Sequence, residues 1–222
     1  MESLAAFFKD GGLFMYIILF VLAVGIAITV ERVIHLVFKY SINSEELWAR
    51  IKKAVLENDV AKARAFCSSS TAPVARLFER ALASHGKGER EIQNAVDEVS
   101  MELIPLVEKR VSYLAMVANV ATLLGLLGTI QGLVQAFQAV GNADPSQKAT
   151  LLASGISIAL YTTALGLIVA IPMLVAYSIL QTRSNKLNDE IDAYSVKIIN
   201  LLIKQHSERR SGARDSGQEA QS

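Results

Sequence analysis

Three long stretches of this sequence contain no Asp, Glu, Lys, Arg or His: residues 11–30, 111–143 and 149–182. A helix that crosses a bilayer needs about 20 consecutive apolar residues, and each stretch reaches that length. A long helix in a soluble protein would instead show a polar face to water. The missing charges therefore predict three membrane-spanning helices, beginning near Leu13, Val111 and Leu151.

Cysteine and histidine are also scarce, and motifs typical of enzymes are missing. Cys67 is the only cysteine, which excludes an internal disulfide, and His35, His85 and His206 show no ligand spacing. The sequence has no Walker loop, no G-x-S-x-G and no H-E-x-x-H motif. Its 21 acidic and 22 basic residues are interspersed. We therefore expect no enzymatic activity, no cofactor, no metal and no nucleic-acid partner.

The basic residues are unevenly distributed between the loops. Thirteen of the 22 lie in residues 31–110 and seven follow Leu180, whereas the N-terminal stub and the loop 141–149 carry one each. Basic loops stay on the cytoplasmic side of a membrane. This predicts a multi-pass membrane protein whose N-terminus lies on the side opposite the cytoplasm and whose C-terminus is cytoplasmic. The first apolar stretch could instead be a signal peptide, but its acidic start favours a retained span.

Apolar residues continue at helical spacing beyond the second and third spans, which predicts two helices that project from the membrane. One apolar face is predicted at Ile92, Val96, Val99, Leu103 and Leu106, and the other at Leu187, Ile191, Tyr194, Ile198 and Leu201. Pro105 could kink the first of these helices. The fold class is therefore all-α: a polytopic membrane protein with three transmembrane helices, two of them extended into a cytoplasmic helical stalk. The expected layout is a periplasmic stub (1–12), a first span with its extension (13–39), a cytoplasmic helical domain (40–88), a long helix (89–140), a periplasmic loop (141–149), a second long helix (150–205) and a disordered cytoplasmic tail (206–222).

Small and hydroxylated residues recur at helical spacing inside the second and third spans. Asn119, Thr122 and Thr129 share one polar side of the second span. The small residues are Gly125, Gly128 and Gly132 in that span, and Gly155, Ala159, Gly166 and Ala170 beside Thr163 in the third. Such residues let membrane helices approach closely. Periodicity alone favours helix packing and leaves open a polar track that lines a conduit.

Neither of these two spans contains a carboxylate or a histidine, the groups that usually form proton relays in membranes. Their tyrosines have an ordinary pKa of about 10 and are poor proton carriers at neutral pH. If the protein conducts protons, the titrating group must therefore come from another chain, most simply from a partner helix.

Two segments in these spans resemble the MotA/TolQ/ExbB proton-channel family. They are ANVATLLGLLGTIQG over residues 118–132, followed by Ala136-Phe137, and GISIALYTTALGLIVAIP over residues 155–172. Glu31-Arg32 and the segment APVAR at 72–76 are similar to the family as well. The likeness covers most of residues 10–205, and the three-span length matches the ExbB and TolQ branch.

The resemblance implies a homo-oligomer, a pentamer in the best-known members, around a single-span partner like ExbD, TolR or MotB whose aspartate carries the ion. Thr129 and Thr163 match the family's pore-facing threonines, and Thr162 is their neighbour. The implied function is a channel or stator subunit that turns ion-motive force into envelope work, such as TonB- or Tol-type transport or gliding. ExbB and TolQ proteins often carry a glutamate where this chain has Ile158, so the branch and the ion, proton or sodium, stay open.

Two other functions remain as alternatives. A non-conducting oligomeric scaffold would use the same small residues only for packing. A small-solute transporter would show inverted repeats and broken helices, and the sequence shows neither.

Overall fold

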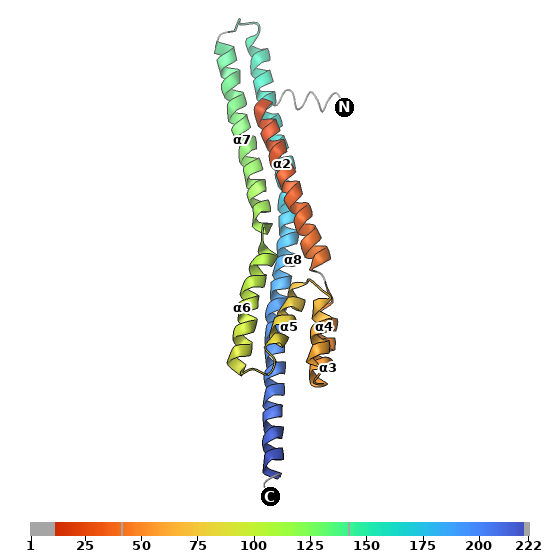
Figure 1. Cartoon of the computed structure of the whole chain (residues 1–222). Coiled ribbons are helices and arrows are strands. Elements are labelled where there is room, and N and C mark those ends of the chain that lie inside the picture. Colours follow the sequence, from red (N-terminus) through yellow and green to blue (C-terminus); the bar gives the residue numbers. More distant parts are fainter. Residues whose placement is uncertain (1–11, 41, 142, 220–222) are drawn as a thin grey trace. The chain divides into compact units, whose positions relative to one another are not determined.

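The computed structural model describes residues 12–40, 42–141 and 143–219, with side chains as far as residue 208. These residues form helices and turns and no strand (Figure 1). The elements are α2 (Gly12–Val33), the π-helix η1 (Ile34–Lys39), α3 (Ser44–Leu56), α4 (Val60–Ser68), α5 (Pro73–Ala83), α6 (Glu89–Glu108), α7 (Val111–Gly141) and α8 (Lys148–Glu219). The prediction of an all-α polytopic membrane protein is confirmed, because three helical segments are long and apolar enough to cross a membrane: Gly12–Lys39, Glu89–Gly141 and Lys148–Glu208.

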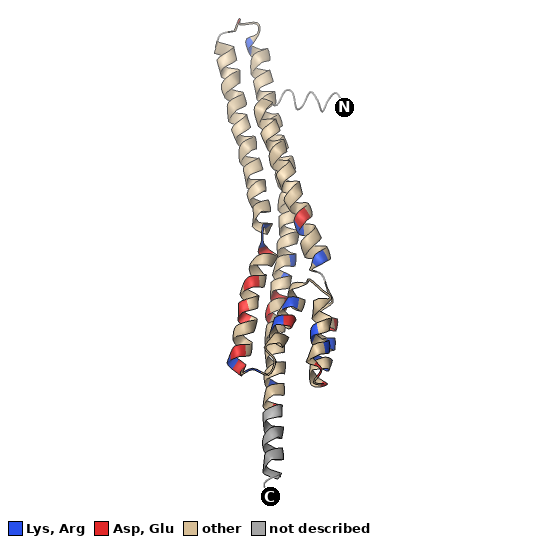
Figure 2. Ribbon diagram, viewed as in Figure 1, with Lys and Arg blue, Asp and Glu red and all other residues tan. Residues whose placement is uncertain are grey.

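The chain divides into two units, and α8 contributes to both. We call the first the membrane unit; it comprises Met1–Val33 and Arg110–Gln181. The second, the extramembrane unit, comprises Ile34–Lys109 and Thr182–Ser222. Charged residues gather on the helices of the extramembrane unit, whereas α2 and α7 are almost free of them (Figure 2). This segregation follows from the cost of placing a charge in hydrocarbon.

In the membrane unit, α2 packs on α7 and α8 through one small residue. An ideal Cβ on Gly25 would lie 2.9 Å from Val117 Cγ1 and 2.7 Å from Met173 Sδ. Thr29 lies one turn further along α2, and its Oγ1 donates to the Gly25 carbonyl at 2.8 Å. Its hydroxyl is thus satisfied without water, as the membrane interior requires.

In the extramembrane unit, local sequence signals start each helix. Asn43 and Asp59 cap α3 and α4, because their side chains accept hydrogen bonds from the backbone N–H groups of Glu46 and Lys62. Pro73 occupies the first turn of α5, where its missing N–H costs nothing. The Glu91 carboxylate accepts from the Gly88 N–H at 2.8 Å and caps α6.

The core of this unit is built from the apolar faces of α3, α5, α6 and α8. At its centre, Phe78 stacks on Trp48 and meets Tyr194 edge-on, with ring centroids 5.6 Å apart in each pair. The same four helices bury aliphatic side chains as well, among them Ile51, Leu77, Leu82, Ile92, Leu103, Ile191 and Ile198. The core explains why α8 stays helical beyond the membrane.

The helix predicted over residues 89–140 is divided in the structure. α6 ends at Glu108 and α7 starts at Val111, and Arg110 between them has a φ of 61°. That left-handed conformation cannot continue a right-handed helix. Pro105, the expected kink, lies inside α6 without ending it. The prediction of one continuous helix was therefore wrong at Lys109-Arg110.

Two predicted details of the apolar faces also differ. α6 buries Val107 rather than Leu106, which is 38% exposed, and α8 buries Leu202 more fully than Leu201. In both helices, the residues three and four positions after a buried residue fit the helical periodicity equally well. Packing against the neighbouring helices decides which of the two is buried.

The first and last segments of the predicted layout, the stub and the tail, can also be compared with the described residues. The tail expected to be disordered from residue 206 continues α8 to Glu219. The stub expected over residues 1–12 lies outside the described residues except for Gly12.

Candidate functional site

The contact between α7 and α8 in the membrane unit contains the glycines singled out in the sequence of the second and third spans, together with Ala159. An ideal Cβ on Gly125 would lie 3.1 Å from the Thr162 carbonyl oxygen, and one on Gly166 would lie 2.7 Å from that of Ala121. No side chain fits between the two backbones at these points. The buried members of the contact are Gly125, Gly128, Gly132, Gly155, Ala159 and Gly166; Ala170 of α8 is buried as well.

The contact extends toward the loop between the two helices in the same manner. An ideal Cβ on Gly132 would lie 3.1 Å from Ala159 N, and one on Gly155 would overlap Ala136. Close backbone contact over several turns gives a large van der Waals contact area in a bilayer, where hydrophobic transfer does not drive helices together. Glycine spacing therefore positions α8 against α7.

Thr162 lies inside this contact. Its side chain is 1% exposed, and an ideal Cβ on Gly128 would lie 2.6 Å from its Cβ. Its Oγ1 donates to the Ala159 carbonyl at 2.9 Å. Within one chain, Thr162 thus packs between α7 and α8 with its hydroxyl satisfied by its own helix.

Thr163 bridges the same two helices by a hydrogen bond. Its side chain is half-buried, and Oγ1 donates to the Gly125 carbonyl of α7 at 3.2 Å. Because a hydroxyl also has two acceptor lone pairs, Thr163 can accept a hydrogen bond from another group while it donates to Gly125. Gly125 precedes Thr129 by one helical turn, so this contact touches α7 close to the second candidate threonine.

Thr129, Thr122 and Asn119 lie on α7 outside the α8 contact. Asn119 and Thr122 are exposed in the single chain and Thr129 is half-buried. The hydroxyls of Thr122 and Thr129 donate to the carbonyls of Ala118 and Leu126 in the preceding turn. The two hydroxyls therefore need no further partner to be satisfied, and Asn119 and Thr122 are accessible to one.

Neither α7 nor residues 149–181 of α8 contains a carboxylate, a histidine or a basic residue. Ile158, which stands where the resemblance leads us to expect a glutamate, is half-buried. Across the described part of the chain no group of histidine, cysteine or acidic side chains could hold a metal ion. These two segments can thus offer hydroxyls, side-chain amides and small residues.

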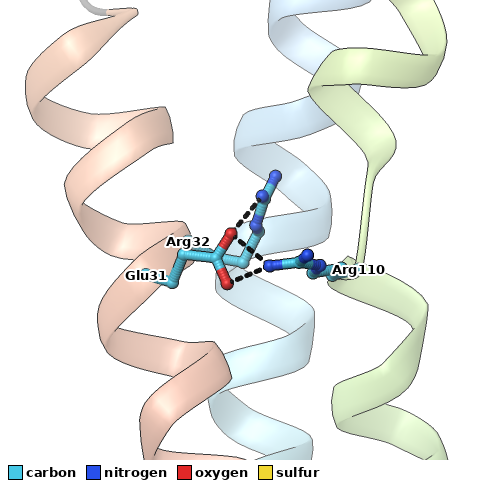
Figure 3. Close-up of polar contacts among 3 residues, drawn as sticks. All are labelled: Glu31, Arg32 and Arg110. Atoms are coloured by element: carbon cyan, nitrogen blue, oxygen red, sulfur yellow. Dashed lines mark hydrogen bonds and ion pairs between the residues drawn. The ribbon is translucent and has the colours of Figure 1, made fainter.

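A cluster of three charged residues lies at one end of the membrane unit (Figure 3). Arg110 Nη1 lies 2.7 and 2.6 Å from the two carboxylate oxygens of Glu31, and Arg32 Nη2 lies 2.8 Å from the first of them. Arg32 is only 3% exposed, and its Nε has no hydrogen-bond partner. Two guanidinium groups on one carboxylate leave the cluster with a net positive charge.

This cluster connects α2 to the break between α6 and α7, because Arg110 is the residue with positive φ. The sequence interpretation used Glu31-Arg32 as part of the family resemblance and did not predict that Arg110 pairs with Glu31. The sequence contains a signal for this cluster. The charged pair Glu31-Arg32 directly follows the first span, and the basic pair Lys109-Arg110 directly precedes the second.

Comparison with known proteins identifies the family of this chain. The model of the MotA/TolQ/ExbB proton channel family matches residues 69–193. The chain is 29% identical over 187 residues to an ExbB homologue of Methanothermobacter thermautotrophicus named for biopolymer transport, covering 83% of this chain and 64% of the relative. It is 38% identical over 104 residues to the Tol-Pal system protein TolQ of Haemophilus influenzae, covering 46% and 44% of the two chains. The chain thus spans less than two thirds of the length of either relative.

Proposed function

We propose, from the premise that this chain belongs to the MotA/TolQ/ExbB proton channel family, that it is the channel subunit of an ion-driven motor, with the proton as the ion. The observation that carries the proposal is the pairing of accessible hydroxyls with the lack of any titratable carboxylate or imidazole in α7 and residues 149–181 of α8. Threonines can hydrogen-bond an ion carrier without competing for its proton. The chain therefore supplies the wall of a pathway and not its proton carrier.

A partner chain must then supply the titrating group. An intramembrane aspartate on a single-span partner, like ExbD, TolR or MotB, is the simplest donor, because acids in membranes face protein or water rather than lipid. We place that carboxylate near Thr129 and Thr163. Asn119, Thr122 and Thr162 complete the proposed pathway, with Thr162 contributing chiefly through its packing on Gly128.

A ring of identical subunits would enclose the partner helix. The exposed polar side of α7, at Asn119 and Thr122, is costly to leave in lipid, which supports a protein-lined environment for it. We propose a pentamer in the bacterial inner membrane, with the N-terminus periplasmic and the C-terminus cytoplasmic, since the basic residues gather in residues 31–110 and after Leu180. The work delivered is envelope work of the TonB, Tol or gliding type.

The experiment is proton flux through the chain and its partner, purified together and reconstituted in vesicles. Thr163→Val should abolish flux while the complex still assembles, and the partner's aspartate changed to asparagine should do the same. Thr29→Val is the matched control, because the hydroxyl of this α2 threonine likewise donates to a glycine carbonyl, that of Gly25. Normal flux in both the Thr163→Val and the partner variants would refute the proposal.

A non-conducting scaffold is the second candidate, and one observation favours it. The hydroxyls of Thr162 and Thr163 both donate to backbone carbonyls inside a single chain, so packing alone could account for these residues. On this hypothesis Thr163→Val leaves activity unchanged, whereas Gly166→Leu, which places a side chain against the Ala121 carbonyl, disrupts assembly.

A further inference from the structure

A small pocket in the extramembrane unit lies among residues that closely follow the first and third spans in the sequence. Its volume is about 100 Å³. The lining residues are Leu36, Tyr40 and Ile42 from the segment after α2, and Arg183, Lys186, Leu187 and Glu190 from α8. The pocket thus combines apolar walls with two cationic side chains close to where the chain leaves the hydrocarbon.

The π-helix η1 shapes one wall of this pocket. The Tyr40 N–H donates to the His35 carbonyl at 2.9 Å, the five-residue spacing of a π-turn. Such wide turns are rare and occur frequently at functional sites. Here the turn buries Leu36, which is 2% exposed, and brings Tyr40 to the same pocket.

The cations of the pocket have no acidic partner. Arg183 and Lys186 form no ion pair with the side chains that the structure describes. Glu190 is the one acid in the lining, and its Oε2 accepts a hydrogen bond from Ser44 Oγ at 2.7 Å. Arg183 and Lys186 precede Glu190 by one to two turns of α8. The two cations are therefore closer than Glu190 to the third span in the sequence.

We propose that this pocket binds the phosphate group of an anionic phospholipid headgroup. Guanidinium and ammonium groups bind phosphate oxygens strongly, and Glu190, the acid in this lining, already accepts a hydrogen bond from Ser44. Basic pockets beside membrane helices are typical of sites for anionic lipids. The volume accommodates a phosphate group, and Leu36, Ile42 and Leu187 provide the apolar contact that glycerol and the first acyl carbons require. The proposal does not depend on ion conduction.

The test is native mass spectrometry of the full-length chain purified in detergent and titrated with phosphatidylglycerol, with phosphatidylcholine or with inorganic phosphate. The test variant is Arg183→Gln/Lys186→Gln. The matched control is Lys62→Gln/Arg64→Gln, which removes the same two charges from the exposed face of α4. A third variant, Arg183→Lys/Lys186→Arg, keeps the charge and controls for disturbed folding.

Phosphatidylglycerol should bind the parent chain saturably and more tightly than phosphatidylcholine. Because each basic residue near a membrane contributes about 1 kcal/mol to the attraction, the double glutamine variant should bind about thirtyfold more weakly. The matched control and the charge-keeping variant should bind like the parent. Equal binding by the parent and the glutamine variant, or equal binding of the two lipids, would overturn the proposal. Binding of inorganic phosphate alone, with no lipid binding, would also overturn it and assign the pocket to a soluble phosphate.

Discussion

Gly128 of α7 faces Thr162 of α8 so closely that an ideal Cβ on the glycine would lie 2.6 Å from both the Cβ and the Oγ1 of the threonine. The branched side chain of Thr162 therefore packs directly against the α7 backbone at Gly128. Thr162 has no room to turn away, since it is buried and its hydroxyl is bound to Ala159.

Gly128→Ala should destabilise the membrane unit by about 1–3 kcal/mol, the usual cost of overpacking a filled contact. Thr162→Gly should recover much of that loss in the double variant, because it removes the opposing Cβ. Thermal unfolding in detergent, followed by circular dichroism, measures both. Gly141→Ala is the control, because a Cβ there meets nothing within 4 Å. Equal unfolding temperatures for Gly128→Ala and Gly141→Ala would contradict the prediction.

Arg110 offers a test of backbone strain at the break between α6 and α7. Its φ of 61° favours glycine over other residues. Arg110→Gly and Arg110→Ala both lose the ion pair with Glu31, but the glycine variant should be more stable by about 1 kcal/mol. Thermal unfolding of the two variants gives the difference.

The neighbouring Lys109 is the matched control for that comparison. Its φ is −45°, a conformation that any residue adopts, so Lys109→Gly should be no more stable than Lys109→Ala. A glycine preference at both positions would show that flexibility, and not the left-handed conformation of Arg110, accounts for the effect.

Cys67 should be almost inert to alkylating reagents in the folded protein. Burial raises the pKa of its thiol from 9.0 to about 12, and the side chain is 1% exposed. Since the thiolate is the reactive form, the pKa shift alone lowers the reactive fraction at pH 8 about a thousandfold. Iodoacetamide labelling followed by mass spectrometry measures the rate. An exposed thiol, Gln93→Cys in a Cys67→Ala background, should react at the rate of a free cysteine.

The same shift makes the stability of the extramembrane unit depend on pH in a defined direction. The folded thiol has the higher pKa, so its contribution to stability is complete below about pH 9 and is lost as the pH rises toward 12. Cys67→Ala should remove this component of the alkaline unfolding profile. An identical profile in the parent and the variant would contradict the prediction.

Phe78 should dominate the stability of the extramembrane unit. Phe78→Ala removes a fully buried ring between Trp48 and Tyr194 and should cost about 3–5 kcal/mol. Trp48 is the only tryptophan, so its fluorescence during urea unfolding reports on this core. Met101→Ala, at a side chain 74% exposed on α6, should change stability by less than about 0.5 kcal/mol. Similar losses in the two variants would rule out the assigned role of the aromatic core.

The sequence predicted the spans well because the bilayer imposes its requirement on each helix separately. A helix in hydrocarbon must be apolar along its whole length whatever its neighbours are, and that property is visible in composition. A helix start such as the one at Asn43 is also a local property, because its side chain caps the N–H of Glu46, three positions along the chain.

The break at Lys109-Arg110 was not predictable in the same way. Neither residue is a strong helix breaker, and the nearby Pro105 is the more obvious candidate. What compensates the unusual conformation of Arg110 is the carboxylate of Glu31, 79 residues earlier in the chain. A contact over that separation leaves no periodic signal.

The sequence by itself determined which polar residues the second and third spans contain and that none of them carries a proton at neutral pH, since those properties belong to side-chain chemistry. Only the tertiary structure decided how those residues are used within one chain. Thr162 is enclosed against Gly128, Thr163 bonds the Gly125 carbonyl, and Thr122 stays exposed. The physical reason is that helical periodicity defines a face of one helix, whereas the residues that cover this face come from a distant part of the chain.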